Sequence, residues 1–191
     1  SGAAWLDHRL YPDAKSLIPF NNGLLSLKEW LQDSATALIP HTPLLLNTNV
    51  LPYDFTYQAE EPIAWLEFIQ NVWPHDPESQ SLLQEWIGYL LLPDTSMHKI
   101  LLMVGPTRSG KGTIGRILQE LLGHANVVGP TLSGLSGEFG LQPLQNKTLA
   151  LIADARLDSR SSKNVIIERL LSISGEDPLT INRKFLPAIT V

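Results

Sequence analysis

Two segments in the second half of the chain are apolar without interruption, residues 100–104 and 149–153. Continuous apolar runs of this length are typical of buried strands, and the second fits a strand covered on both faces of a parallel sheet. Between the runs, over residues 113–122, apolar side chains recur three and four positions apart, and Gly123 suits a helix end. The order of strand, helix and strand predicts an α/β fold with a parallel sheet.

Two further helical patterns lie in the first half of the chain. One has Pro62 at a position that fits the first residue of a helix, and apolar side chains recur at helical spacing from Ala64 to Val72. The other covers residues 79–92 and follows Asp76-Pro77-Glu78, a capping residue, a first-turn proline and an acid placed well for the helix dipole. Prolines interrupt the first 60 residues, where a short hairpin after Asn21-Asn22-Gly23 and another short strand within residues 41–49 are indicated. These patterns predict a smaller, mostly helical domain over residues 1–96 and a second domain over residues 97–191.

The C-terminal segment ends in a basic pair. Residues 164–174 have helical periodicity, with Val165, Ile166, Leu170 and Ile173 expected to face inward. A turn at residues 174–177 then leads into alternating residues that finish with Arg183 and Lys184. This pattern predicts a strand or hairpin with a charged tip.

Composition limits the classes of protein that the chain can belong to. Its 191 residues include no cysteine, which excludes disulfides and thiolate metal sites. No apolar run approaches the roughly 20 residues needed to cross a bilayer, and nothing resembles a signal peptide. We therefore expect a protein of the cytoplasm, without a membrane partner.

Charge is distributed unevenly along the chain. The formal net charge is −5. Residues 1–96 hold 3 Lys/Arg against 12 Asp/Glu, whereas residues 97–191 hold 11 Lys/Arg against 7 Asp/Glu. The basic half permits contact with a polyanion without requiring it, because a solvated basic face would have the same composition.

A glycine-bearing segment directly follows the first apolar run. Main-chain N–H groups of such a turn, together with a helix N-terminus, form a cradle for anions, and the lysine can reach the β- and γ-phosphates of a nucleotide. The segment therefore predicts binding of a nucleoside triphosphate, the alternative being a turn that only links strand to helix. The candidate binding residues are Gly105, Pro106, Thr107, Arg108, Ser109, Gly110, Lys111, Gly112 and Thr113.

The loop departs from the usual phosphate-binding pattern at one position. That pattern places a Mg²⁺-binding hydroxyl directly after the lysine. Here Gly112 follows Lys111, and the hydroxyl comes one position later on Thr113. Three contacts of Thr113 are therefore open: with the metal, with the water shell of the metal, or with the α-phosphate.

A second element is needed to hold the metal. Asp154 directly follows the second apolar run, in the place where P-loop proteins carry a Mg²⁺-binding acid. The alternative is a capping aspartate at the end of a core strand. No second acid follows Asp154, and the spacing does not select the residue that activates water among Glu138, Asp158, Glu168, Glu176 and Asp177.

Several residue strings occur in the order found in one family. The phosphate loop, Ala153-Asp154-Ala155-Arg156, and Ser174-Gly175-Glu176-Asp177 leading to Arg183-Lys184 together resemble the phage and plasmid primase-helicases. The helicase part of that family belongs to superfamily three of the AAA+ ATPases. The upstream strings resemble the helical domain that precedes the ATPase in the poxvirus-type branch; they are Asn22-Gly23-Leu24-Leu25, Leu51-Pro52-Tyr53-Asp54 and Glu85-Trp86-Ile87-Gly88-Tyr89-Leu90.

The resemblance implies a P-loop AAA+ core and a function in DNA replication. The family forms rings, usually hexamers, that hydrolyse ATP and move along single-stranded DNA. By the resemblance, Lys111 grips the β- and γ-phosphates, Asp154 organises Mg²⁺, and Arg183 and Lys184 face DNA phosphates from a hairpin in the ring channel. Arg183 and Lys184 could equally keep an exposed strand edge soluble. Arg156 and Arg169 either reach a neighbouring subunit's nucleotide or form surface ion pairs.

The family pattern also includes elements that are not found in this chain. A strand ending in a polar sensor and an arginine finger would be expected beyond Val191, and a primase module would be expected before the helical domain. We therefore expect a C-terminally truncated helicase core that binds ATP and hydrolyses it poorly alone. A P-loop small-molecule phosphotransferase and a non-enzymatic, nucleotide-switched interaction module are the alternatives.

Overall fold

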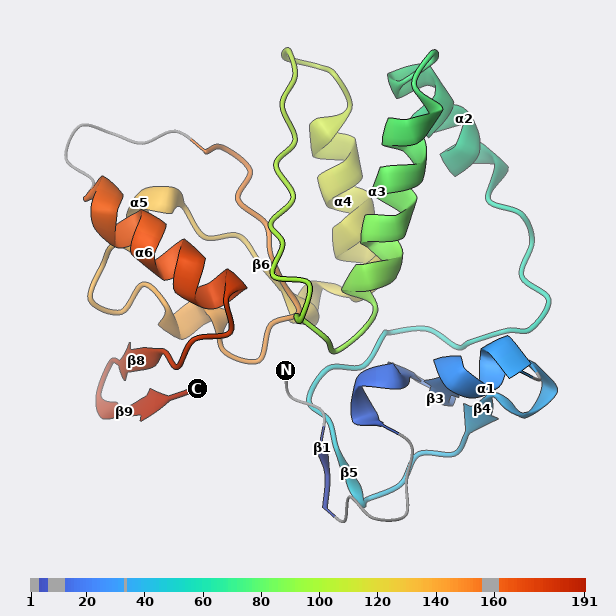
Figure 1. Cartoon of the computed structure of the whole chain (residues 1–191), viewed down its shortest axis with the longest axis horizontal. Coiled ribbons are helices and arrows are strands. Elements are labelled where there is room, and N and C mark those ends of the chain that lie inside the picture. The colour runs from blue at the N-terminus through green and yellow to red at the C-terminus, as the bar shows by residue number, and fades with distance from the viewer. Residues whose placement is uncertain (1–3, 7–12, 33, 156–161) are drawn as a thin grey trace.

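The computed structural model describes residues 4–6, 13–32, 34–155 and 162–191. Helices and strands are mixed within this part of the chain, as expected for an α/β protein, and the strands form small sheets of two or three strands. Three helices stand side by side at the centre, with the N-terminal strands below them and the C-terminal helices and hairpin to one side (Figure 1).

The N-terminal region is built from short strands. Strands β2 (Leu17–Phe20), β3 (Gly23–Ser26) and β4 (Leu38–Ile39) form an antiparallel sheet in that order. The hairpin predicted after Asn21-Asn22-Gly23 is confirmed, since β2 and β3 join across this turn. Strand β1 pairs with β5, and one α-helix and two 3₁₀ helices complete the region: β1 (Ala4–Trp5), β5 (Leu45–Leu46), α1 (Leu27–Gln32), η1 (Ala14–Ser16) and η2 (Ser34–Thr36).

The three central helices agree with their sequence patterns. They are α2 (Ile63–Val72), α3 (Pro77–Leu90) and α4 (Lys111–Leu122). Helix α3 begins after Asp76, whose Oδ1 accepts a hydrogen bond from the Ser79 main-chain N–H at 2.9 Å. The helices share one buried cluster made of Ile69, Leu83, Ile114 and Leu118. The phosphate-loop helix is therefore packed directly on the two helices that precede it.

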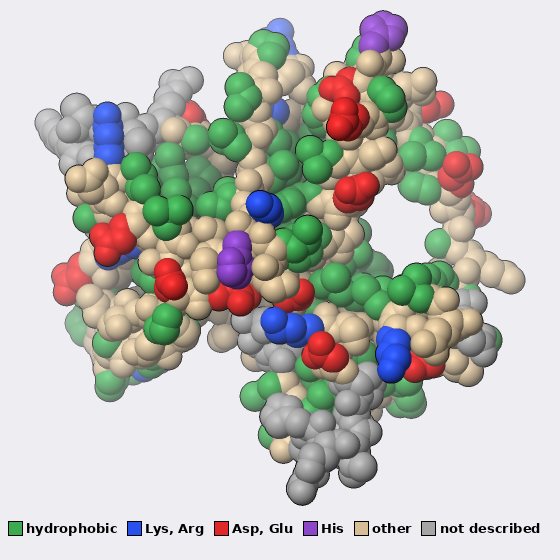
Figure 2. Space-filling view, in the orientation of Figure 1, with side chains coloured by type: hydrophobic (Ala, Val, Ile, Leu, Met, Phe, Trp, Pro, Cys, Tyr) green, Lys and Arg blue, Asp and Glu red, His purple; other side chains and the backbone are tan. Residues whose placement is uncertain are grey.

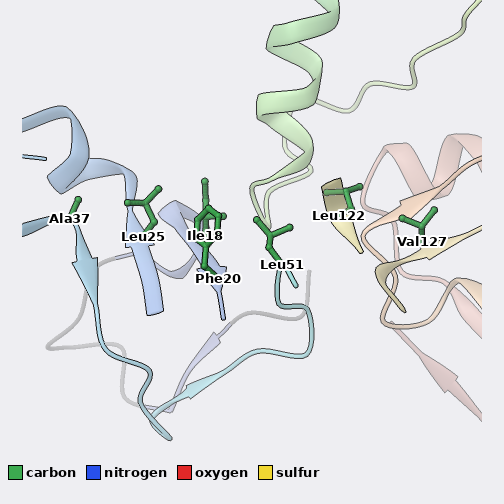
Figure 3. Close-up of a cluster of buried hydrophobic side chains, with 7 residues drawn as sticks. All are labelled: Ile18, Phe20, Leu25, Ala37, Leu51, Leu122 and Val127. Atoms are coloured by element: carbon green, nitrogen blue, oxygen red, sulfur yellow. The ribbon is translucent and has the colours of Figure 1, made fainter. Parts of the chain in front are cut away.

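A second buried cluster joins the N-terminal sheet to the far end of α4. Leu51 lies between the strand residues and Leu122, which is the last residue of α4 (Figure 3). The cluster also includes Val127 of strand β6 (Val127–Val128). Buried contacts thus run across the predicted boundary between residues 96 and 97, and the division into two domains stays a prediction.

The first apolar run differs from its prediction. Residues 97–106 form no strand, although Leu101 and Met103 pack against the cluster of the central helices. The alternate side chains Ile100, Leu102 and Val104 are 59%, 72% and 87% exposed. The expectation of a buried strand is wrong here, because the segment has one covered face and no hydrogen-bonded neighbouring strand among the described residues.

The second apolar run is a strand only at its start. Strand β7 (Leu149–Ala150) pairs in parallel with β6, and the Leu151 N–H extends the pairing by donating to Val128 O at 2.8 Å. Residues 151–155 continue without strand structure, and Ala153 to Ala155 are exposed. The prediction of a strand over 149–153 is therefore correct in position and too long.

The C-terminal part contains two helices and a hairpin around a third buried cluster. Helix α6 (Lys163–Ser174) confirms the predicted helix, and Ile166 is buried as expected, whereas Ile173 is exposed. Strands β8 (Thr180–Arg183) and β9 (Leu186–Thr190) form the antiparallel hairpin that was predicted. The loop after β6 holds α5 (Leu132–Leu135), and two 3₁₀ helices, η3 (His124–Asn126) and η4 (Gln142–Leu144), flank this region.

Candidate nucleotide site

The phosphate loop depends on two left-handed residues. Arg108 has φ 64° and Gly110 has φ 88°, a conformation that glycine adopts without steric cost. A Cβ atom at Gly110 would also lie 3.0 Å from Val72 Cγ2 and 3.3 Å from Phe68 Cζ, both on α2. Gly110 therefore serves twice, as the turn into α4 and as the point where the loop approaches α2.

The loop closes around the ammonium group of Lys111. Lys111 Nζ donates to Gly105 O at 2.8 Å, to Pro106 O at 2.7 Å and to Ser109 Oγ at 3.0 Å. Gly105 makes this closure possible, since a Cβ there would lie 2.9 Å from Ser109 Oγ. A positive charge is thus held inside a ring of main chain at the N-terminus of a twelve-residue helix, where the first N–H groups have no partner within the helix.

The hydroxyl of Thr113 points along the helix. Thr113 Oγ1 accepts a hydrogen bond from Arg116 Nη2 at 3.1 Å, one turn further along α4. Gly112 is exposed, and the nearest atom to a Cβ placed there would be Arg116 Nη1 at 3.8 Å. A metal at this site would compete with Arg116 for the Thr113 hydroxyl, so the choice among the three predicted contacts of Thr113 stays open.

The segment that leads to Asp154 packs against α4. A Cβ at Gly115 would lie 3.1 Å from Leu151 Cδ2, which brings residue 151 to the second turn of the helix that Lys111 begins. Asp154 follows three positions later and is exposed. Within the described ranges no three His, Asp or Glu side chains gather into a metal site. Mg²⁺ is commonly held by one or two protein groups together with substrate phosphates, and pairing of Asp154 with Thr113 stays a prediction.

The candidate acids for activating water occupy different surroundings. Glu138 and Glu168 are exposed. Glu176, at φ 59°, accepts a short hydrogen bond from the Thr95 hydroxyl and lies 3.9 Å from His98 Nε2. Asp177 donates its main-chain N–H to Ser172 O at 3.1 Å. Glu176 thereby connects the α6–β8 turn to the segment that leads into the phosphate loop.

Arg156 and Arg169 were predicted either to reach a neighbouring subunit's nucleotide or to form surface ion pairs. Arg169 donates from Nη1 to the carbonyl oxygens of Leu135 and Gly137, the latter at 2.7 Å, so in this structure it caps the end of α5. Neither of the two predicted roles includes this contact. Arg156 lies outside the described residues, as does Asp158 among the candidate acids.

The basic pair lies at the end of the β8–β9 hairpin. Arg183 Nε donates to Pro187 O at 2.8 Å, and the Lys184 main-chain N–H donates to Gln142 Oε1 at 3.0 Å. Lys184 Nζ lies 5.2 Å from the centroid of the Phe185 ring, which is 93% exposed. The sequence prediction named the two cations and missed Phe185, although an aromatic residue next to a basic pair at a turn was a readable signal.

A cavity of about 780 Å³ lies away from the phosphate loop. Its walls come from the N-terminal region, the end of α3 and the C-terminal segment, and residues 105–113 do not line it. Around the loop itself, hydrophobic side chains reach the surface along the segment 97–106 (Figure 2). The two features are separate, so a ligand at the cavity and a ligand at the loop would contact different residues.

Comparison with known proteins gives one family match. The model of a family of unknown function (DUF5906) matches residues 103–191, which is just under half of the chain. The match includes the phosphate loop, Asp154 and the hairpin. No curated protein matches the chain. Among the described residues, no helix has the length and apolar character needed to cross a membrane.

Proposed function

We propose that this chain is the ATP-binding core of a replicative DNA helicase of the primase-helicase type. The observation that carries the proposal is the closure of residues 105–111 around the Lys111 ammonium at the start of α4. A helix N-terminus and a loop of main-chain amides favour an anion, and the lysine supplies the balancing point charge. A phosphate chain entering this loop would replace two carbonyl oxygens as the partner of Lys111.

Each residue of the site has a definite task in this proposal. Lys111 and the amides of residues 105–113 hold the β- and γ-phosphates, and Asp154 and Thr113 hold Mg²⁺. Mg²⁺ held by these two residues would neutralise charge on the phosphates. In the hydrolysis itself, a water oxygen bonds to the γ-phosphorus and the bond from that phosphorus to the β–γ bridging oxygen breaks. The acid that accepts the water's proton is not assigned.

The proposal includes a P-loop AAA+ core as the architecture of the nucleotide-binding part of the chain. In a P-loop AAA+ core the segment before the loop and the segment before the metal-binding acid are strands of one parallel sheet. The parallel β6–β7 pair, which begins the segment leading to Asp154, supports this arrangement. The matched family has no assigned function, so its contribution is limited to grouping the loop, Asp154 and the hairpin in one unit.

The proposal extends to the assembled protein. Six copies would form a ring around single-stranded DNA in the cytoplasm of a bacterial host, with a primase module in the parent chain. ATP hydrolysis at the subunit interfaces would drive the β8–β9 hairpin, with Arg183 and Lys184, along the DNA phosphates. The excess of cations over residues 97–191 supports this contact with a polyanion.

Calorimetric titration with ATP tests the proposal. We expect Lys111→Ala to abolish measurable ATP binding, because the triphosphate loses the cation that the loop holds in place. Lys163→Ala is the matched control, since Lys163 also begins a twelve-residue helix and should leave binding unchanged. Equal loss in both variants, or none in either, would refute a specific phosphate loop.

The same titration with and without Mg²⁺ examines Asp154. Asp154→Asn should weaken ATP binding in the presence of Mg²⁺ and leave Mg²⁺-free binding nearly unchanged, because only the metal needs the carboxylate. An equal effect under both conditions would remove the metal role of Asp154. Phosphate transfer from ATP to a nucleoside monophosphate would instead favour the phosphotransferase alternative.

A further inference from the structure

Phe185, at the tip of the β8–β9 hairpin, has a solvent-exposed aromatic ring. Arg183 pairs with Leu186, so Lys184 and Phe185 form a two-residue turn (Figure 1). Phe185 has φ 63°, at a kind of turn position that normally carries Gly or Asn. Its ring is 93% exposed. Neither turn chemistry nor packing therefore explains a phenylalanine at this position.

The hairpin is supported so that its tip keeps this orientation. Ile181 of β8 belongs to the third buried cluster, and Ile189 of β9 packs against it. The other buried residues of this cluster are Leu132, Leu135, Leu141 and Ile166. At the tip, the Lys184 N–H is held by the Gln142 side chain and the Arg183 side chain by Pro187 O. The ring is thus presented by a braced element rather than by a free terminus.

The chemistry of the tip selects a particular ligand. Two cations precede the ring in the sequence, Arg183 and Lys184, and Lys184 Nζ lies 5.2 Å from the ring centroid. Cations attract phosphodiesters, and an aromatic face stacks on any unpaired base. In a duplex the base faces are already stacked on one another, so both features are satisfied together only by a single strand.

We infer that Phe185 is a base-stacking contact for single-stranded DNA, with Lys184 and Arg183 holding the adjacent phosphates. This inference rests on the proposed function and deepens it, since it adds to the two cations a residue that contacts the bases themselves. The inference predicts two contributions to the binding free energy. The stacking contribution requires bases and is insensitive to the salt concentration, whereas the contribution of the phosphate contacts falls as the salt concentration rises.

Fluorescence anisotropy with two labelled 20-mers separates these terms. One probe is oligothymidylate and the other is an abasic deoxyribose-phosphate strand of the same length. We expect the wild-type chain, with ATP and Mg²⁺ present, to prefer the first. Phe185→Ala should weaken oligothymidylate binding about 5- to 150-fold, the range expected for one lost base stack, and should leave abasic binding unchanged.

Matched variants identify the kind of contact. Phe185→Trp should keep the preference for bases, and Phe185→Leu, which keeps apolar volume without a ring, should lose it. Leu186→Ala, at a neighbouring residue that is 57% exposed, should have no effect. Lys184→Ala should lower the salt slope of log K by about 1 and retain the preference for bases.

Several outcomes would overturn the inference. The wild-type chain could bind neither probe, or bind both with equal affinity. The Phe185→Leu variant could bind oligothymidylate as the wild type does, or Leu186→Ala could weaken oligothymidylate binding as much as Phe185→Ala. ATP titration on the same samples keeps the proposed function separate, because Phe185→Ala should bind ATP as the wild type does. Failure of the wild-type chain to bind ATP would refute the nucleotide site, whatever the result with DNA.

Discussion

At the residue scale, the candidate site depends on glycines whose requirements differ. Gly110 has a left-handed backbone and lies against α2, whereas Gly112 is exposed on α4 with nothing closer than Arg116 to a built Cβ. The loop pattern identified both residues from the sequence. Only the structure distinguishes them, because the distance from Gly110 to Val72 depends on how α2 packs against α4.

Alanine substitutions at these two glycines should have opposite effects. Gly110→Ala should lower the free energy of unfolding by at least about 1–2 kcal/mol, the cost of a left-handed conformation for a residue with a Cβ. Gly112→Ala should raise it by up to about 1 kcal/mol, because alanine is the better helix former. Chemical denaturation measures both changes. A stabilised Gly110→Ala variant would contradict the loop geometry described above.

Phe185 shows the limit of sequence reasoning at this scale. Arg183 and Lys184 were predicted because charge and spacing identify them directly. The exposure of Phe185 depends on the register of β8 with β9 and on the absence of any covering element among the described residues. A phenylalanine in sequence is read as a packing residue by default, so its surface position was not expected.

At the element scale, the longer helices were predicted from local patterns, and the strands only in part. The patterns for α2, α3, α4 and α6 are local, since periodicity, caps and prolines lie within each segment. A strand depends on a partner elsewhere in the chain, which no local pattern identifies. The run over 100–104 is therefore apolar and extended and still lacks strand pairing among the described residues. In the first 60 residues the β2–β3 hairpin and the short strand within residues 41–49, which is β5, were predicted, whereas β1 and β4 were not.

The cap of α3 gives a test at this scale. Hydrogen bonds from the Ser79 hydroxyl and main-chain N–H hold the pKa of Asp76 below its usual value. A carboxyl whose pKa is lowered by folding stabilises the fold above its unfolded pKa, about 4. This contribution disappears as the pH falls through the lower folded pKa.

Thermal melting between pH 7 and pH 3 checks the cap. Asp76→Ala should melt below the wild type at pH 7, and this difference should shrink as the pH falls below about 4 toward the lowered pKa of the folded carboxyl, where the wild-type carboxylate becomes protonated. Asp76→Asn keeps a capping oxygen and should melt near the wild type at pH 7 with less dependence on acid. A constant difference between wild type and Asp76→Ala over the whole range would contradict a charged cap.

At the scale of the whole molecule, the phosphate loop is packed into a continuous body. Helix α4 shares one buried cluster with α2 and α3, and its last turn shares another with the N-terminal sheet (Figure 3). Thr95 and His98, before the loop, contact Glu176 before the hairpin. A change at the nucleotide site therefore has direct contacts through which it can reach the β8–β9 hairpin. Sequence patterns grouped these segments only by family resemblance, since the contacts join residues about 80 positions apart.

Amide hydrogen exchange with and without ATP and Mg²⁺ tests the central claim most directly, because it reports where on the chain the nucleotide binds. The account predicts slower exchange in peptides covering residues 105–114, and no such change in Lys111→Ala. Protection of residues 47–51 and 90–95, which line the separate cavity, with residues 105–114 unchanged, would contradict it.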